Sequence, residues 1–144
     1  MRARRVFKTR HFSRWVRKTE LTDRALCDAI VEMEKGLLDA DLGGDVVKKR
    51  VPLPGRGKSG SVRTLIATNK DNRWFFIFGF AKNERQNVSA RELDALQNIA
   101  ADLLKLSSKE LDAHVETKAL LEICHAGKDQ GEQPNSRRGS QDRA

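Results

Sequence analysis

The seven residues from Trp74 to Phe80 constrain the fold most, because this run contains aromatic, aliphatic and glycine residues and no charged or hydroxyl side chain. An apolar strand of this kind has to be covered on both of its faces. The segment from Ser61 to Thr68 is the other strongly strand-like part of the chain, and the polar turn residues 69–72 connect the two. We therefore predict a hairpin whose second strand is the buried centre of a sheet.

The remaining elements are a strand, two helices and another strand before the hairpin, and two helices after it. We expect first a strand over residues 6–9 and then a basic helix with Phe12, Trp15 and Val16 on its apolar face. A helix over residues 22–38, a glycine-containing turn over residues 39–44 and a strand over residues 45–51 follow. After the hairpin, two helices begin at the capping boxes of Ser89 and Ser107, and the second of them runs through Ile123. This order predicts an α+β domain with helices packed on a small antiparallel sheet.

The chain has 144 residues, enough for one domain to bury a core without covalent cross-links. Apolar side chains run out near residue 126, so we expect a domain over residues 1–125 and a disordered polar tail over residues 126–144. Cys27 and Cys124 fall in helical apolar patterns, and we expect both to be small buried residues in a reduced compartment, not a disulfide. No apolar run approaches the ~18 residues of a membrane span and no signal-peptide core is present, so a cytoplasmic protein without a membrane partner is expected.

Charge is segregated along the chain. Residues 48–91 contain eleven lysines or arginines and only two acids, Asp71 and Glu84, and they include the predicted hairpin. A sheet that concentrates positive charge repels itself unless an anion lies across it, and the nucleic-acid backbone is the commonest large anion in a cell. A solvated basic face is the simpler explanation, but this degree of segregation favours a surface that binds RNA or DNA.

Several familiar site motifs are excluded. Gly55 to Gly60 matches a dinucleotide-binding glycine pattern, but it opens a strand instead of a helix, and Pro52 stands where a phosphate-binding loop needs its first glycine. We expect a flexible basic loop whose Arg56 and Lys58 contact phosphates. The histidines and cysteines show no metal-ligand spacing, and no histidine is expected near the basic sheet, so neither a metal nor a cofactor is predicted.

Three clusters of basic residues can converge on one phosphate, because neighbouring strands lie about 4.8 Å apart. The clusters are Lys48, Lys49 and Arg50 on one strand, Arg63 on the next, and Lys82 and Arg85 after the central strand. RNA cleavage without a metal requires deprotonation of the 2′-oxygen, stabilisation of a phosphorane and protonation of the leaving 5′-oxygen. Arg63 suits the phosphorane because a guanidinium is always charged and binds bidentately, and a lysine in a crowded cationic cluster can act as the base. A binder whose cations only position phosphates stays equally open from these residues.

Four segments carry a resemblance to a known family. They are Arg5-Val-Phe-Lys-Thr9, Asp39-Ala-Asp-Leu-Gly-Gly44, Gly60-Ser-Val-Arg-Thr64 and Phe78-Gly-Phe-Ala-Lys-Asn-Glu-Arg85. In this order they resemble the RelE/HigB-like toxins of bacterial type II toxin–antitoxin modules, over roughly residues 4–125. The resemblance implies a small microbial-ribonuclease-like fold, cleavage of messenger RNA at the ribosome, and inhibition by a cognate antitoxin, often of the helix-turn-helix type.

The resemblance also assigns roles by position. Arg63 matches the family's strand arginine that contacts the scissile phosphate. Its catalytic or phosphate-binding lysines correspond in position to Lys48, Lys49 and Arg50. The basic residues that follow its last strand correspond to Lys82 and Arg85. Asn83 and Ser89 depart from RelE itself, which has an arginine and a catalytic tyrosine there, and Glu84 is a further catalytic candidate. Two alternatives remain: a toxin of this fold that acts on a protein, as ParE toxins act on DNA gyrase, and a non-catalytic domain that binds RNA or the ribosome.

Overall fold

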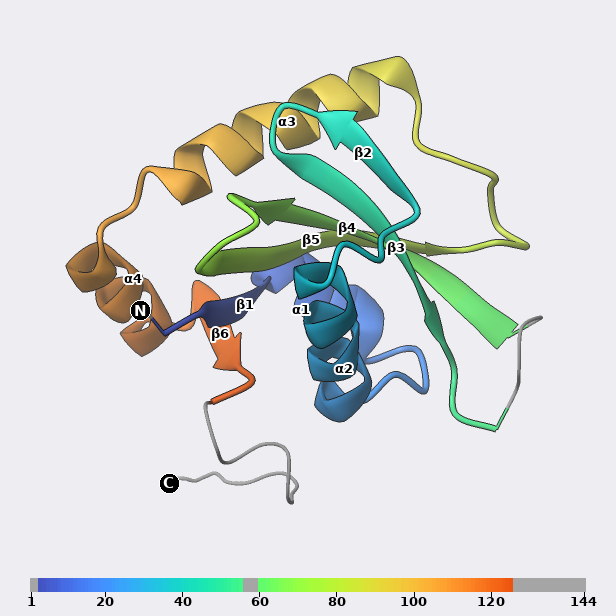
Figure 1. The fold of residues 1–144 in the computed structure, drawn as a ribbon, viewed down its shortest axis with the longest axis horizontal. Helices are drawn as coiled ribbons and strands as arrows, with labels where there is room; N and C mark the ends of the chain where they lie inside the picture. The colour runs from blue at the N-terminus through green and yellow to red at the C-terminus, as the bar shows by residue number, and fades with distance from the viewer. Residues whose placement is uncertain (1–2, 56–59, 126–144) are drawn as a thin grey trace.

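The computed structural model describes residues 3–55 and 60–125. The expectations for Arg56, Lys58 and the tail at residues 126–144 lie outside these ranges. Within them the chain forms four helices and six strands (Figure 1). In chain order the elements are β1 (Arg5–Thr9), α1 (Arg10–Val16), α2 (Asp23–Glu34), β2 (Ala40–Gly43), β3 (Val46–Pro52), β4 (Ser61–Thr68), β5 (Arg73–Ala81), α3 (Ala90–Leu104), α4 (Ser108–Glu116) and β6 (Leu120–Ile123).

The strands form one sheet in the order β2-β3-β4-β5-β1-β6. β1 pairs with β5 in parallel, and the other neighbouring pairs are antiparallel. α3 and α4 follow one another along one side of this sheet, and α1 and α2 lie together on the other (Figure 1). The predicted α+β class is therefore confirmed, and the sheet is antiparallel as expected except for the parallel pair of β1 and β5. In the part of the chain that the structure describes, no helix is long and apolar enough to cross a bilayer.

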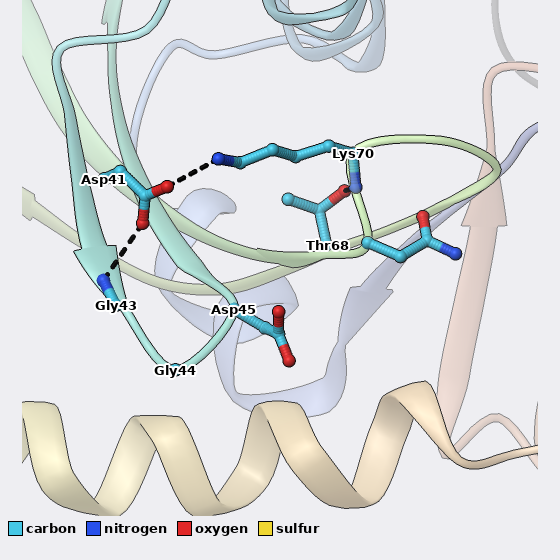
Figure 2. A pocket seen from close by; sticks show the side chains of 7 residues that line it. Asp41, Gly43, Gly44, Asp45, Thr68 and Lys70 are labelled. Carbon is cyan, nitrogen blue, oxygen red and sulfur yellow. Dashed lines mark hydrogen bonds and ion pairs between the residues drawn. The ribbon is translucent and has the colours of Figure 1, made fainter.

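The turn after β2 lies beside the turn between β4 and β5 (Figure 2). Lys70 of the second turn forms an ion pair with Asp41 of β2, and Gln97 of α3 donates a hydrogen bond to the carbonyl of Gly43 at 3.0 Å. Gly44 has a left-handed φ of 59°, and a Cβ there would lie 2.6 Å from Cγ of Gln97. Glycine at this position therefore allows the turn to pass under α3.

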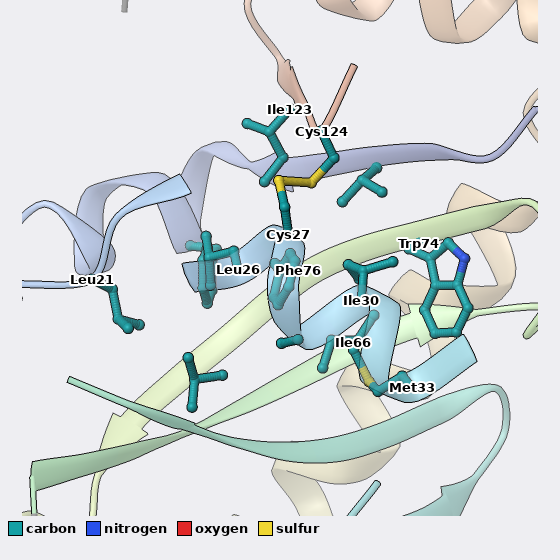
Figure 3. Close-up of a cluster of buried hydrophobic side chains, with 14 of the residues drawn as sticks. Leu21, Leu26, Cys27, Ile30, Met33, Ile66, Trp74, Phe76, Ile123 and Cys124 are labelled. Carbon is teal, nitrogen blue, oxygen red and sulfur yellow. A yellow bond between two sulfur atoms is a disulfide. The ribbon is translucent and has the colours of Figure 1, made fainter. Parts of the chain in front are cut away.

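β5 is the central strand because its side chains fill hydrophobic cores on both faces. Trp74 and Phe76, which are labelled in Figure 3, are fully buried in the cluster that includes residues of α1 and α2. Phe75 and Ile77 belong to the cluster with α3 and α4 on the opposite face. Because a buried aromatic or aliphatic side chain stabilises the fold by about 1.5–3 kcal/mol, this strand anchors the domain. The prediction of a central strand buried on both faces is confirmed.

A β-bulge changes which face the end of β5 presents. Leu65 pairs with Phe78, and the next residue, Ile66, pairs with Phe76, so Ile77 is the extra residue of β5. Both Ile77 and Phe78 consequently pack on the α3 side of the sheet. The residues that follow alternate between the two faces from this new setting.

The expected last helix is too long. α4 ends at Glu116, and Lys118 then adopts a left-handed backbone with φ 65°, which closes the helix. Residues 120–123 form β6, which pairs antiparallel with β1 at one edge of the sheet. Ile123, which the apolar spacing placed on the helix, belongs to this short strand instead.

The helix expected over residues 22–38 is also too long. It ends at Glu34 with Lys35 as its C-cap, and the left-handed Gly36, with φ 88°, follows. Part of the expected turn is β2, the other edge strand, which pairs with β3. The turn itself is confined to Gly44 and Asp45, which both have positive φ.

Cys27 and Cys124 form a disulfide bond, so the expectation of two reduced cysteines in helices is wrong (Figure 3). Cys27 lies on α2, whereas Cys124 directly follows β6 and is not helical. Pairing of β6 with β1 brings Cys124 to α2, and the two Cα atoms lie 5.5 Å apart despite a sequence separation of 97. Separation along the chain carries no information on this proximity, which depends on where the last strand joins the sheet.

Removal of this disulfide by the double substitution Cys27→Ala and Cys124→Ala is expected to lower the free energy of unfolding by about 2–4 kcal/mol, because the cross-link restricts a long loop in the unfolded chain. Urea denaturation with and without reductant measures the effect. The wild type should lose stability in reductant, and the double variant should be indifferent to it. Equal stability of all four samples would show that the bond does not form in solution.

Candidate functional site

Two arginines face each other across neighbouring strands. Arg50 of β3 and Arg63 of β4 are direct partners in the register, so their side chains project from the same face of the sheet. Leu65 and Ala67, which alternate with Arg63 along β4, belong to the α3-side core and identify that face. Within residues 3–55 and 60–125, neither arginine has a hydrogen bond or an ion pair from its side chain. Like charges directly opposite one another destabilise a sheet, so this pair suits a bound anion.

A third arginine extends this row. Phe80 of β5 is the register partner of Arg63, and Arg85 from the following loop lies over the ring of Phe80, with its Cζ 6.0 Å from the ring centroid. The same Cζ lies 5.8 Å from the ring of Phe78. We call Arg50, Arg63 and Arg85 the arginine face, since all three lie on the α3 side across β3, β4 and β5.

Arg85 is held in place by the start of α3. Its Nη1 lies 2.6 Å from Oε1 of Glu92, and Glu92 forms a capping box with Ser89 at the helix N-terminus. The hydrogen bond from Arg85, followed by that from the Ser89 backbone N–H, lowers the pKa of the Glu92 carboxyl to about 2. The same carboxylate raises the pKa of Arg85 above its ordinary value. The arginine is thus fixed in position yet keeps a guanidinium edge for a ligand.

Lys49 does not join the arginine face. Its Nζ pairs with Oε1 of Glu32 at 2.7 Å and donates to the carbonyl of Leu37 at 2.9 Å, and only 8% of the residue is exposed. Successive residues of a strand point to opposite faces, so Lys49 lies on the α2 side when Arg50 lies on the α3 side. The expected convergence of Lys49 with Arg63 is therefore wrong. A lysine held by a carboxylate also fits poorly with the predicted role as a base.

Lys48 lies on the same side of β3 as Arg50, two positions away. Its register partner on β4 is Leu65, two residues beyond Arg63, so the lysine is a diagonal neighbour of the arginine pair. It is half-buried, and no side-chain partner is found for it in the described parts of the chain. Lys48 thus adds a fourth positive charge beside the arginine face.

The residues directly after β5 stand at the end of the same ladder. Lys82 is exposed and has no partner among the described residues. Glu84 folds back, and its Oε1 accepts a hydrogen bond from the backbone N–H of Ala81 at 3.1 Å. Ser89 is the N-cap of α3. Its hydroxyl accepts from the N–H of Glu92 at 3.1 Å and is committed to that role.

A polar pocket of about 310 Å³ lies at the start of β3 and the end of β4, away from the ends of these strands that carry Arg50 and Arg63 (Figure 2). Asp41 and Asp45 contribute carboxylates to its lining, and Lys70 is paired with Asp41. This ion pair and the N–H of Gly43 lower the pKa of Asp41. Because the pocket is acidic and its lysine is neutralised, it is a poor phosphate site. Among the described residues, no three His, Cys, Asp or Glu side chains are grouped so as to hold a metal ion.

A family model described as the RelE toxin of the RelE/RelB toxin–antitoxin system matches residues 4–123. This chain belongs to the RelE toxin family. It is therefore a toxin of a toxin–antitoxin system, and its family implies an antitoxin as partner. The matched segment runs from β1 to β6 and includes the whole arginine face. No individually curated protein matches the chain at a significant level.

One side chain of this RelE-family toxin lies at the site without a signal in the sequence. His11 of α1 is stacked on Phe78, with ring centroids 5.6 Å apart and ring planes inclined by 5°. Phe78 is the ring that also contacts Arg85. The expectation that no histidine lies near the basic sheet is therefore wrong. Periodicity places His11 on an exposed helix turn, and only the parallel pairing of β1 with β5 brings it to this ring.

The carboxyl of Glu92 has a pKa of about 2 and is therefore expected to stay ionised until the pH falls to about that value. Arg85→Ala should raise this pKa toward 4.5. A lowered pKa stabilises the folded state above pH 4.5, and this contribution is lost as the pH falls from 4.5 to about 2. NMR titration of side-chain carboxyl carbons measures both values. Glu110, in the second capping box with Ser107 and without an arginine, is the internal control and should not change. An unchanged Glu92 in the variant would contradict the ion pair.

Proposed function

We propose that this RelE-family toxin is a ribosome-dependent endoribonuclease that cleaves messenger RNA and so inhibits translation. The observation that carries the proposal is the direct opposition of Arg50 and Arg63, two cations without partners among the described residues. Folding places like charges side by side at an electrostatic cost, which a bound phosphate diester would offset. Arg85, from the loop after β5, lies over Phe80 on the next strand of the same row, so a backbone that crosses the ladder meets one arginine at each of the three strands.

The proposed reaction uses the RNA's own 2′-hydroxyl as the nucleophile. A base removes its proton, the 2′-oxygen attacks the neighbouring phosphorus, and the 5′-oxygen leaves with a proton, so that the products carry a 2′,3′-cyclic phosphate and a 5′-hydroxyl. Arg63, central in the row, is proposed to stabilise the phosphorane. Lys82 and Glu84, at the end of β5, are the candidates for proton transfer, since Lys49 is engaged by Glu32.

The partners follow from the same proposal. The antitoxin is proposed to be of the helix-turn-helix type, and its reading frame should then lie beside that of the toxin. Action on translating ribosomes would take place in the cytoplasm. Lys48 and Arg50 are proposed to bind phosphates flanking the scissile one, because they lie beside Arg63 on the same face.

RNA binding without cleavage is the second candidate, and the position of Lys49 favours it. A catalytic set needs a base close to the phosphate, and the structure removes one of the predicted lysines to the other side of the sheet. The arginine face would then position RNA or ribosomal RNA and block translation by occupancy alone.

Arg63→Ala is expected to relieve growth arrest and to lower the cleavage rate by about 10²–10³-fold, because loss of one charged donor to a transition state has effects of this size. Growth curves at matched soluble protein levels and primer extension on cellular messenger RNA measure the two effects. Arg24→Ala is the matched control, an exposed arginine on α2 outside the arginine face. Equal arrest by wild type and Arg63→Ala would exclude Arg63 from the mechanism.

Substitution of a single 2′-deoxynucleotide on the 5′ side of the cut should abolish cleavage and leave binding nearly unchanged, because phosphate contacts supply most of the affinity. Cleavage on programmed ribosomes and retention of toxin on the same complexes give the two readouts. Normal cleavage of the deoxy substrate would exclude attack by the 2′-oxygen. Binding of both substrates with cleavage of neither would favour the second candidate.

A further inference from the structure

His11 presents a flat aromatic surface beside the arginine face. Its ring is parallel to that of Phe78 within 5°, at a centroid distance of 5.6 Å, which is the offset-stacked arrangement of aromatic pairs. Phe78 is half-buried against the α3-side core, whereas His11 is exposed. The imidazole therefore lies between a fixed hydrophobic ring and solvent.

Contacts between α1 and β5 hold His11 in this position. Thr9, the N-cap of α1, donates its hydroxyl to the carbonyl of Phe76 at 3.3 Å. One helical turn after His11, Trp15 packs on Gly79, where a Cβ would lie only 2.2 Å from the indole ring. The helix is thus fixed to the strand on both sides of His11, and the stacking surface is preformed.

Positive charge flanks this surface. Arg85 of the arginine face has its Cζ 5.8 Å from the ring of Phe78, so His11 and Arg85 share one aromatic neighbour. Arg14 lies three residues after His11 on α1, which places the two on the same side of the helix. Arg14 is exposed and has no side-chain partner in the described ranges.

We infer that His11 and Phe78 form a stacking subsite for one unpaired base of an RNA strand whose phosphates lie along the arginine face. This inference rests on the proposed function. Single-stranded RNA is recognised by stacking of splayed bases on aromatic side chains, while cations track its backbone. The arginine face supplies the cations, and His11 is the exposed ring stacked on Phe78 beside it. Since every base has a flat face, the subsite accepts any of the four.

The test uses a fluorescent 2′-O-methyl RNA of about eight nucleotides, which cannot be cleaved, and versions of it with one abasic position moved along the strand. Fluorescence anisotropy at several salt concentrations gives the dissociation constants. His11→Ala is expected to weaken binding about tenfold, the loss that corresponds to one stacked base. The salt dependence should not change, because no phosphate contact is lost. His11→Phe should bind like wild type.

The abasic series identifies the base. One abasic position should weaken the binding of RNA to the wild type by the same factor as the substitution His11→Ala. The same abasic RNA should bind the His11→Ala variant no more weakly than the intact RNA does. His114→Ala is the matched control, because His114 is bound to the carbonyl of Glu110 on α4, outside the arginine face. Circular dichroism and melting temperatures should be nearly the same for all variants, since His11 is exposed and His114 is only half-buried.

The outcomes separate this inference from the proposed function. If wild type and His11→Ala bind equally and with full salt dependence, the subsite is excluded and the arginine face stands. A smaller salt dependence in His11→Ala would assign the imidazole to a phosphate and exclude stacking. If the wild type shows no salt-dependent binding, or if Arg63→Ala binds as tightly as wild type, the arginine face does not hold this RNA and the subsite is excluded, whereas the proposed function stands or falls by the cleavage assays on ribosomes.

Discussion

The antiparallel ladder of β3, β4 and β5 is the constraint on which the rest of the structure depends. It sets Arg50 beside Arg63, a pairing of like charges that isolated side chains would avoid, and it sets Arg63 beside Phe80. The two-sided burial of β5 supplies the free energy that holds this register. The bulge at Ile77 then brings the last aromatic residues of β5 to the face on which the arginines lie.

The cations of the sheet are neutralised to different extents on its two faces. On the α2 side, acidic residues of that helix neutralise cations of the sheet, with Glu32 bound to Lys49 and Asp23 bound to Lys8. On the α3 side, Glu92 binds Arg85, but the two arginines on β3 and β4 have no carboxylate partner in the described residues. The acidic residues of α2 therefore neutralise the cations on one face of the sheet. The cations that have no carboxylate partner are concentrated on the other face, over the ladder of β3 and β4 next to α3.

Much of the fold is predictable from local signals. The capping boxes at Ser89 and Ser107 set two helix starts correctly, and the apolar run of β5 identified the centre of the sheet. The faces of β3 were harder, because a run of three cations has no hydrophobic alternation to show that Lys49 points away from its neighbours. The positions of Cys124 and His11 depend on which strands meet β1, and strands of four residues such as β6 leave too short a pattern to identify.

The bond between Cys27 and Cys124 closes a covalent ring that contains β2 to β6 and the whole arginine face, and only β1, α1 and the start of α2 lie before it. A single backbone cut between β3 and β4 would open this ring without releasing either piece, since the sulfur bridge still joins them. The oxidised toxin would then run as one species in a denaturing gel and separate into two only after reduction. Damage to its backbone would therefore stay hidden in the oxidised protein.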